Sequence, residues 1–200
     1  MSKIVLRRGV ELENPLDLAL GFVEAYWRSE RDTGSGSSTF DEGDLRRANR
    51  GGARISAAEI AAILERRSEI ERALREIDPG TSLTATSAIP WPALLQLFDA
   101  FADIRGIGFS KMTKALHPKR PALIPMLDSV VRTYLTADDP SASSGSFGAR
   151  AIALVRSYKQ DVDRNRTGLD ELRRELARRG YQLTEVRILD LLIWSASAEG

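Results

Sequence analysis

The residues best suited to chemistry form a short glycine-rich turn, Asp103-Ile-Arg-Gly-Ile-Gly108. Gly106 and Gly108 permit a sharp backbone turn with positive φ, and Ile104 and Ile107 are expected to anchor that turn in the core. Backbone N–H groups at the start of the following helix then face outward, where the helix dipole helps them to hold a phosphate oxygen. The turn is therefore predicted to grip a nucleic-acid backbone, although a plain connector between two helices can carry the same glycines.

Positive charge is concentrated around the same turn. No Asp or Glu occurs from position 104 to position 127, whereas five Lys and Arg residues do. Lys111 and Lys114 lie three positions apart and therefore share one side of the predicted helix. Contacts of this kind place a protein on a nucleic-acid backbone without reading base sequence. The predicted backbone contacts are Gly106, Ile107, Gly108, Ser110, Lys111 and Lys114, and the further candidates, either phosphate contacts or solvated loop charges, are Arg105, Lys119 and Arg120.

Helices must position this turn, because almost the whole chain shows helical periodicity. Apolar residues within 94–101 mark one face of a helix that precedes the turn. Capping boxes at Thr39–Glu42 and Ser56–Glu59 predict two further helix starts, the second opening a long helix. Thr184 is expected to cap the last helix, whose apolar pattern places Trp194 in the core. We therefore predict a single all-α domain over residues 1–200, with the turn and its helices at 91–135 and flexible loops at about 31–38 and 138–146.

Composition narrows the classes of function. The chain has no cysteine and one histidine, His117, which excludes disulfides, thiolate zinc sites, cysteine-ligated iron–sulfur clusters and multi-histidine metal sites. No metal or other cofactor is expected. No apolar run approaches the roughly 18–20 residues that cross a bilayer, so we expect no membrane association and a cytoplasmic location. The net charge of +1 counts against strong nonspecific nucleic-acid binding, and the sequence leaves the oligomeric state open.

The segment Trp91–Tyr134 resembles the helix–hairpin–helix DNA glycosylase superfamily. Ile104-Arg-Gly-Ile-Gly108 is similar to the L-P-G-V-G hairpin, and Asp128 follows the second glycine by twenty positions, about where the superfamily places an essential aspartate. Ile124-Pro-Met-Leu-Asp128 is similar to the F-P-I-L-D segment of adenine-specific mismatch glycosylases. The resemblance implies a glycosylase-like helical fold, DNA as the partner, a role in DNA repair, and Asp128 as the catalytic carboxylate, which would stabilise a positively charged sugar and activate water.

Departures from the hairpin pattern refine this expectation. Arg105 replaces the usual proline, and Ser110 stands where bifunctional relatives carry a Schiff-base lysine. Lys114 lies one turn beyond Ser110 and is a poor substitute for that lysine. The resemblance thus implies a monofunctional enzyme, a hydrolase without lyase activity or an iron–sulfur cluster. Segments 40–45, 117–121 and 186–194 also resemble an uncharacterised, mostly actinobacterial family, which implies no activity.

Three hypotheses remain open at the level of sequence. The first is a monofunctional DNA glycosylase in which Asp128 assists hydrolysis of the N-glycosidic bond. The second is a non-catalytic nucleic-acid-binding or interaction module that retains the hairpin. The third is a helical protein in which the turn is only a fold element. Asp128 precedes Ser129-Val-Val-Arg132 and could simply cap that helix, and His117, before Pro118, is expected at a helix end.

Overall fold

The chain is helical throughout the part that the structure describes. The computed structural model describes residues 3–30, 37–85, 88–136 and 145–198, and within these ranges it contains ten α-helices, two short 3-10 helices and no strand. The predicted all-α fold class is therefore confirmed. The helices are η1 (Arg7–Gly9), α1 (Pro15–Glu30), α2 (Glu42–Arg50), α3 (Ala57–Glu65), α4 (Arg67–Arg75), α5 (Trp91–Asp99), α6 (Phe109–Leu116), η2 (His117–Lys119), α7 (Ser129–Thr136), α8 (Phe147–Arg164), α9 (Arg166–Arg178) and α10 (Glu185–Ala198).

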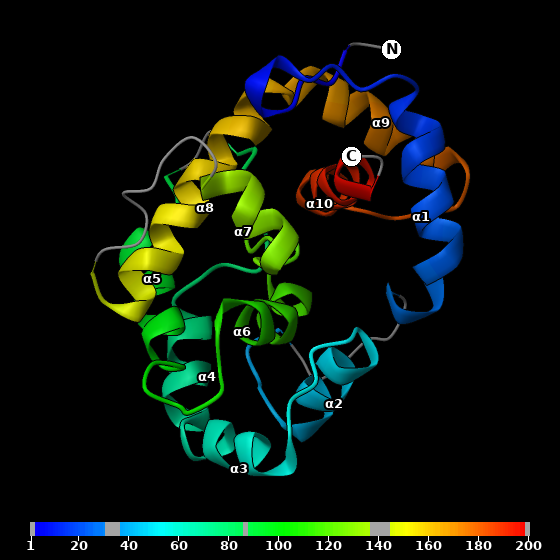
Figure 1. Ribbon diagram of the computed structural model, residues 1–200. Helices are drawn as coiled ribbons and strands as arrows, with labels where there is room; N and C mark the ends of the chain where they lie inside the picture. Colours follow the sequence, from blue (N-terminus) through cyan, green and yellow to red (C-terminus); the bar gives the residue numbers. More distant parts are fainter. Residues whose placement is uncertain (1–2, 31–36, 86–87, 137–144, 199–200) are drawn as a thin grey trace.

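The helices surround one connected core. Helices α2, α3 and α4 gather at one end of the molecule, and α9, α10 and the N-terminal segment lie toward the other (Figure 1). Between the ends, α5 packs against α8, and α7 packs against α10. Buried apolar side chains from Ile4 to Ile193 form a single cluster. The predicted loops at 31–38 and 138–146 lie largely outside the described residues.

Two of the predicted helix starts are confirmed. Ser56 and Glu59 form a capping box, in which Ser56 Oγ accepts from Glu59 N at 3.3 Å and Glu59 Oε2 accepts from Ser56 N at 2.7 Å. The hydroxyl of Thr184 accepts from Arg187 N at 3.1 Å at the start of α10. Each contact satisfies a backbone donor that the first turn of a helix leaves unpaired.

Two other local predictions are wrong. The capping box of α2 is formed by Asp41 and Asp44 instead of Thr39 and Glu42, because Asp41 directly precedes the helix and its carboxylate also suits the positive end of the helix dipole. The long helix predicted after Ser56 is interrupted at Arg66, where α3 ends and α4 begins.

Most residues of the segment from 117 to 128 are buried, although most of the segment is not helical. His117 Nδ1 lies 2.6 Å from the carbonyl oxygen of Ile124, which fixes the path of the chain after α6. The amide of Leu127 donates to Thr113 Oγ1 at 3.0 Å. Side chains thus satisfy backbone groups that no helix or sheet partner reaches.

Arg120 and Lys119 belong to this interior. Arg120 is fully buried, and its guanidinium donates to the carbonyls of Leu74, Ile77 and Ser37. Lys119 is 3% exposed, and its Nζ lies 2.8 Å from Asp44 Oδ1. Neither side chain reaches the surface, so the structure gives both a packing role in place of the predicted phosphate contacts.

Replacing Arg120 by methionine is expected to lower the free energy of unfolding by about 3–5 kcal/mol, because several buried carbonyls would lose their donor. The matched control is Arg178→Met, which removes a solvent-exposed pair with Glu175 and should cost less than about 1 kcal/mol. Urea unfolding of both variants measures the difference. Equal, small losses for the two variants would contradict a structural role for Arg120.

Candidate functional site

The predicted turn joins α5 to α6. Gly106 adopts a φ of +85°, whereas Gly108 is extended at −113°, so positive φ is found at only one of the two glycines. Ile107 is 8% exposed, and its amide donates to the carbonyl of Ile104 at 3.0 Å, which anchors the turn as expected. No side chain caps α6, whose N-cap residue is Gly108. The first backbone N–H groups of α6 are thus left without a side-chain acceptor.

A carboxylate from α3 lies directly against the turn. Lys111 Nζ contacts Glu59 Oε1 at 2.7 Å and Oε2 at 2.8 Å, and both side chains are largely shielded from solvent. The bonds from Lys111 and from the Ser56 amide hold the pKa of Glu59 below its usual value. A Cβ on Gly106 would lie 2.1 Å from Glu59 Oε1. Gly106 is therefore required both by its positive φ and by the close approach of Glu59, and the charge of Lys111 is already matched.

Asp128 joins the start of α7 to α10. Its Oδ1 accepts from Val131 N at 3.0 Å, which is the helix-cap contact left open by the sequence. Its Oδ2 accepts from Trp194 Nε1 at 2.9 Å. Trp194 is 37% exposed and packs edge-on against Phe22, so the expectation that it lies in the core is wrong. Asp128 itself is 6% exposed, which leaves a buried carboxylate with a donor on each oxygen.

Lys114 lies in the electrostatic neighbourhood of Asp128. Its Nζ donates to the carbonyls of Gly51 and Gly52 at 3.1 and 3.4 Å. Burial lowers the pKa of Lys114, the Asp128 carboxylate opposes this effect, and Arg187 and Arg54 add to it. Elements far apart in sequence (the start of α7, α10 and the loop after α2) therefore bring one carboxylate and two further cations within electrostatic range of Lys114.

A second carboxylate in this part of the molecule belongs to Asp190 on α10. It is fully buried, its Oδ2 accepts from Met126 N at 3.2 Å, and its Oδ1 has no hydrogen-bond partner within the described residues. Burial raises the pKa of Asp190 to about 7, although Arg187 and the Met126 amide act in the opposite direction. The neutral form is favoured because an ionised carboxylate in a low-dielectric interior would lose its hydration.

The predicted site residues do not share one free surface. Arg105 is exposed, and Ser110 and Lys114 are half-buried. Lys111 is paired with Glu59, while Lys119 and Arg120 lie in the interior. Asp190 was not predicted as a site residue. Its only indication in the sequence is its place as an acidic residue between Leu189 and Leu191 in an apolar helix. The second role of Glu59 was not predicted either, because local sequence assigns this residue only to a helix cap.

The described ranges contain neither a metal-binding cluster nor a membrane-spanning helix. No group of three or more His, Cys, Asp or Glu side chains there could hold a metal ion. No helix among those described is long and apolar enough to cross a membrane.

Comparison with known proteins identifies a family without assigning an activity. A family of unknown function (DUF6308) matches residues 22–197, which is most of the chain. No curated protein and no solved structure matches the chain.

The raised pKa of Asp190 predicts how stability depends on pH. The folded-state pKa of about 7 exceeds the ordinary value of 3.8, so the folded protein binds a proton more tightly than the unfolded chain. The associated stabilisation is complete below about pH 4 and is lost as the pH rises to about 7, a change on the order of 4 kcal/mol. Urea unfolding between pH 4 and 8 should show this loss in the native protein and not in Asp190→Asn.

The control is Asp170→Asn on the exposed surface of α9. Hydrogen bonds from Arg173 and Arg174 lower the pKa of Asp170, so this residue does not titrate between pH 4 and 7. The control should therefore follow the native pH dependence. A difference between native protein and Asp190→Asn that stays constant across this range would show that Asp190 is ionised in the fold.

Proposed function

The chain belongs to this family of unknown function, and we propose its function from the geometry of the site. It binds the sugar–phosphate backbone of DNA through the turn between α5 and α6, in a helix–hairpin–helix DNA glycosylase-like fold. Asp128 assists hydrolysis of an N-glycosidic bond, so that the protein acts as a monofunctional base-excision DNA glycosylase. The observation that carries the proposal is that the buried Asp128 carboxylate lies within electrostatic range of Lys114, a cation of the helix that follows the turn.

Three features support DNA backbone binding. The uncapped start of α6 offers backbone N–H groups and the positive end of a helix dipole, both of which suit a phosphate oxygen. Arg105 on the turn is exposed, and so is Arg54 after α2. Lys114 is half-buried between the turn and Asp128, and the nearby charges of Arg54 and Arg187 make this side of the molecule attractive to a polyanion.

Asp128 has the properties that glycosidic hydrolysis requires. As the C1′–N bond of a nucleotide breaks, its electron pair leaves with the base and positive charge develops on the sugar. A carboxylate held in place by Val131 N and Trp194 Nε1 could stabilise that charge without reorganising. Water then forms the new C1′–O bond, and its proton passes to the carboxylate or to the departing base. The target base must first leave the duplex stack.

The side chains around Asp128 support hydrolysis and do not favour an amine nucleophile. Ser110 takes the position of the lysine that forms a Schiff base in bifunctional enzymes, and its side chain cannot form an imine. The ammonium of Lys114 donates to two backbone carbonyls, which stabilise its protonated form against the lowering of its pKa by burial. We therefore propose base release without strand cleavage.

A second candidate function is DNA binding without hydrolysis. Two observations about Asp128 favour it. Both carboxylate oxygens already accept a hydrogen bond, and only 6% of the residue is exposed. A helix cap shared with Trp194 needs nothing more than these contacts. In this version the hairpin has kept its affinity for phosphate, and Asp128 is structural.

Asp128→Asn and Trp194→Phe separate the two candidates. A glycosylase should release free base from at least one member of a panel of duplexes that contain deaminated, oxidised or alkylated bases. Asp128→Asn should lower that rate at least about 100-fold, because the negative charge is lost. Trp194→Phe keeps both the carboxylate and the aromatic contact with Phe22, and it should retain most of the activity.

Thermal unfolding of the same variants provides the structural control. Asp128→Asn keeps one oxygen that can accept from either the Val131 amide or the Trp194 indole, and Trp194→Phe removes the indole donor. Each variant therefore loses one hydrogen bond, and similar melting temperatures are expected. If native protein binds duplex DNA and releases no base from any member of the panel, the second candidate holds and the first is overturned. If borohydride traps a covalent adduct that Lys114→Gln abolishes, the monofunctional assignment is wrong.

DNA binding itself is tested by a charge reversal at Lys114. Lys114→Glu should weaken binding to a short duplex by about tenfold or more at low salt, since it places a negative charge beside the phosphate site. The matched control, Lys159→Glu, makes the same change on α8, where Lys159 pairs with Asp163. Gel mobility shift at several salt concentrations measures both. Absence of binding by the native protein at low salt would overturn both candidate functions.

A further inference from the structure

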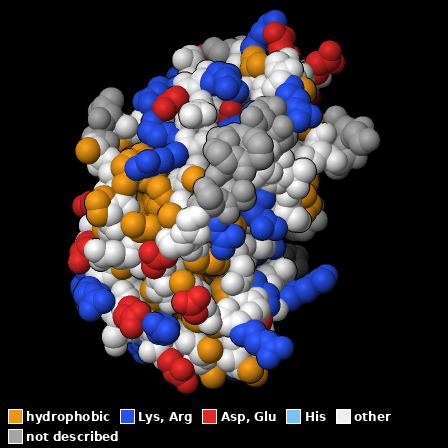
Figure 2. Space-filling view, turned by 60° about the vertical axis from the view of Figure 1, so that its left-hand side comes forward, with side chains coloured by type: hydrophobic (Ala, Val, Ile, Leu, Met, Phe, Trp, Pro, Cys, Tyr) orange, Lys and Arg blue, Asp and Glu red, His pale blue; other side chains and the backbone are white. Residues whose placement is uncertain are grey.

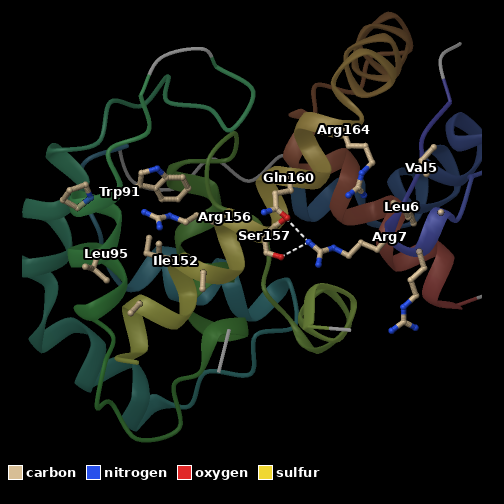
Figure 3. A pocket seen from close by; sticks show the side chains of 15 residues that line it. Val5, Leu6, Arg7, Trp91, Leu95, Ile152, Arg156, Ser157, Gln160 and Arg164 are labelled. Carbon is tan, nitrogen blue, oxygen red and sulfur yellow. Dashed lines mark hydrogen bonds between the residues drawn. The ribbon is translucent and has the colours of Figure 1, made fainter. Parts of the chain in front are cut away.

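A cavity of about 1000 Å³ opens between the N-terminal segment, the start of α5 and one face of α8. Its lining combines an apolar floor, which includes Leu95 and Ile152, with a tryptophan, Trp91, and several arginines (Figure 3). On the face of the molecule shown in Figure 2, hydrophobic side chains gather in a patch with Lys and Arg along its upper edge and acidic side chains to its left and below. The volume is of the size that proteins use for small organic ligands.

The charged side chains that line this cavity all carry positive charge. Four arginines line it, Arg7, Arg8, Arg156 and Arg164, and no Asp or Glu is among the lining residues. Two of the four are held by the buried carboxylate of Asp161, which accepts from Arg7 Nε at 2.8 Å and from Arg164 Nη1 at 2.7 Å. Arg7 also donates to Ser157, as Figure 3 shows. These contacts fix the two guanidinium groups in the wall of the cavity, and the Asp161 carboxylate balances one of their two charges.

Arg156 has a different environment. Its guanidinium lies 4.9 Å from the centroid of the Trp91 ring, and Figure 3 shows the two side chains together at one end of the cavity. It is exposed, and no carboxylate lies within 4 Å of it in the described part of the chain. A guanidinium stacked on an indole presents a flat surface and several N–H donors at the same place.

The turn that carries Arg8 is conformationally strained. Arg8 has a φ of +59°, which costs energy for a residue with a side chain, and Gly9 follows at +74°. This backbone path bends the N-terminal segment over the cavity, where Arg8 and Gly9 both contribute to its lining. Strain of this kind persists where the surrounding structure holds the backbone in place. Here it places Arg8 at the lining of the cavity.

We propose that this cavity binds a nucleotide, with the base stacked at Trp91 and Arg156 and the phosphate held by the arginines of the opposite wall. A flat aromatic surface suits the base, and the guanidinium N–H donors of the opposite wall suit a phosphate. The site lies apart from Asp128 and the turn between α5 and α6, and it does not depend on the proposed glycosylase function. The ligand class is a nucleoside mono- or diphosphate.

Isothermal titration calorimetry with adenosine 5′-diphosphate tests the proposal, and adenosine and inorganic phosphate serve as separate probes. The nucleotide should bind at least about tenfold more tightly than either fragment, because it alone engages both ends of the cavity. Arg156→Gln and Trp91→Leu should each weaken nucleotide binding by about tenfold. The control Arg178→Gln, on the exposed surface of α9, should leave it unchanged.

A second readout locates the ligand and guards against misfolded variants. The chain has three tryptophans, and Trp91→Leu identifies the Trp91 indole signal in a ¹H–¹⁵N spectrum. Saturation with nucleotide should shift that signal in the native protein and in Lys114→Glu. The proposal is overturned if millimolar nucleotide neither releases heat nor shifts the Trp91 indole, or if Lys114→Glu abolishes binding while Arg156→Gln does not.

Discussion

Burial of an irregular connecting segment is the constraint on which the rest of the structure depends. Residues 120–128 pass through the interior between α6 and α7, and an unpaired polar backbone group there would cost about 1–3 kcal/mol. Side chains supply the partners: Thr113 bonds to the Leu127 amide and Asp190 to the Met126 amide, and nearer the surface Thr184 donates to the Pro121 carbonyl. The position of Asp128 follows from this network, because it ends the segment that the network fixes.

The same constraint explains which features could be predicted from sequence. Helix caps at Ser56 and Thr184 and the turn at Gly106 depend on neighbours within a few residues, so local patterns indicate them. Arg120 and Lys119 carry the charges of a surface loop, yet they serve an interior that forms only when α2 and α4 pack nearby. Their sequence context contains no sign of that packing. Asp190 is similar, since only the assembled fold shows which backbone amide it accepts.

The cations near the turn between α5 and α6 and those along α8 have different kinds of partner. Near the turn, an internal carboxylate matches one cation, as Glu59 does for Lys111. Along α8, the buried Asp161 fixes two arginines, whereas Arg156 rests on an aromatic ring. A net charge of +1 conceals this distribution, because acidic and basic residues balance over the whole chain and not within each region. Affinity for an anion therefore depends on which cations already have a partner.

The contact between Gly106 and Glu59 also bears on how the chain can evolve. A Cβ at position 106 would collide with the Glu59 carboxylate unless that side chain left its bonds to Lys111 and Ser56, so a change on α3 makes a substitution at 106 easier. Loss of Glu59 would in turn leave Lys111 without its partner and the Ser56 amide without its cap. Positions 59, 106 and 111 thus form an epistatic group in which the order of mutations matters. An insertion or deletion that shifts α3 relative to α6 would be tolerated only together with compensating change at this turn.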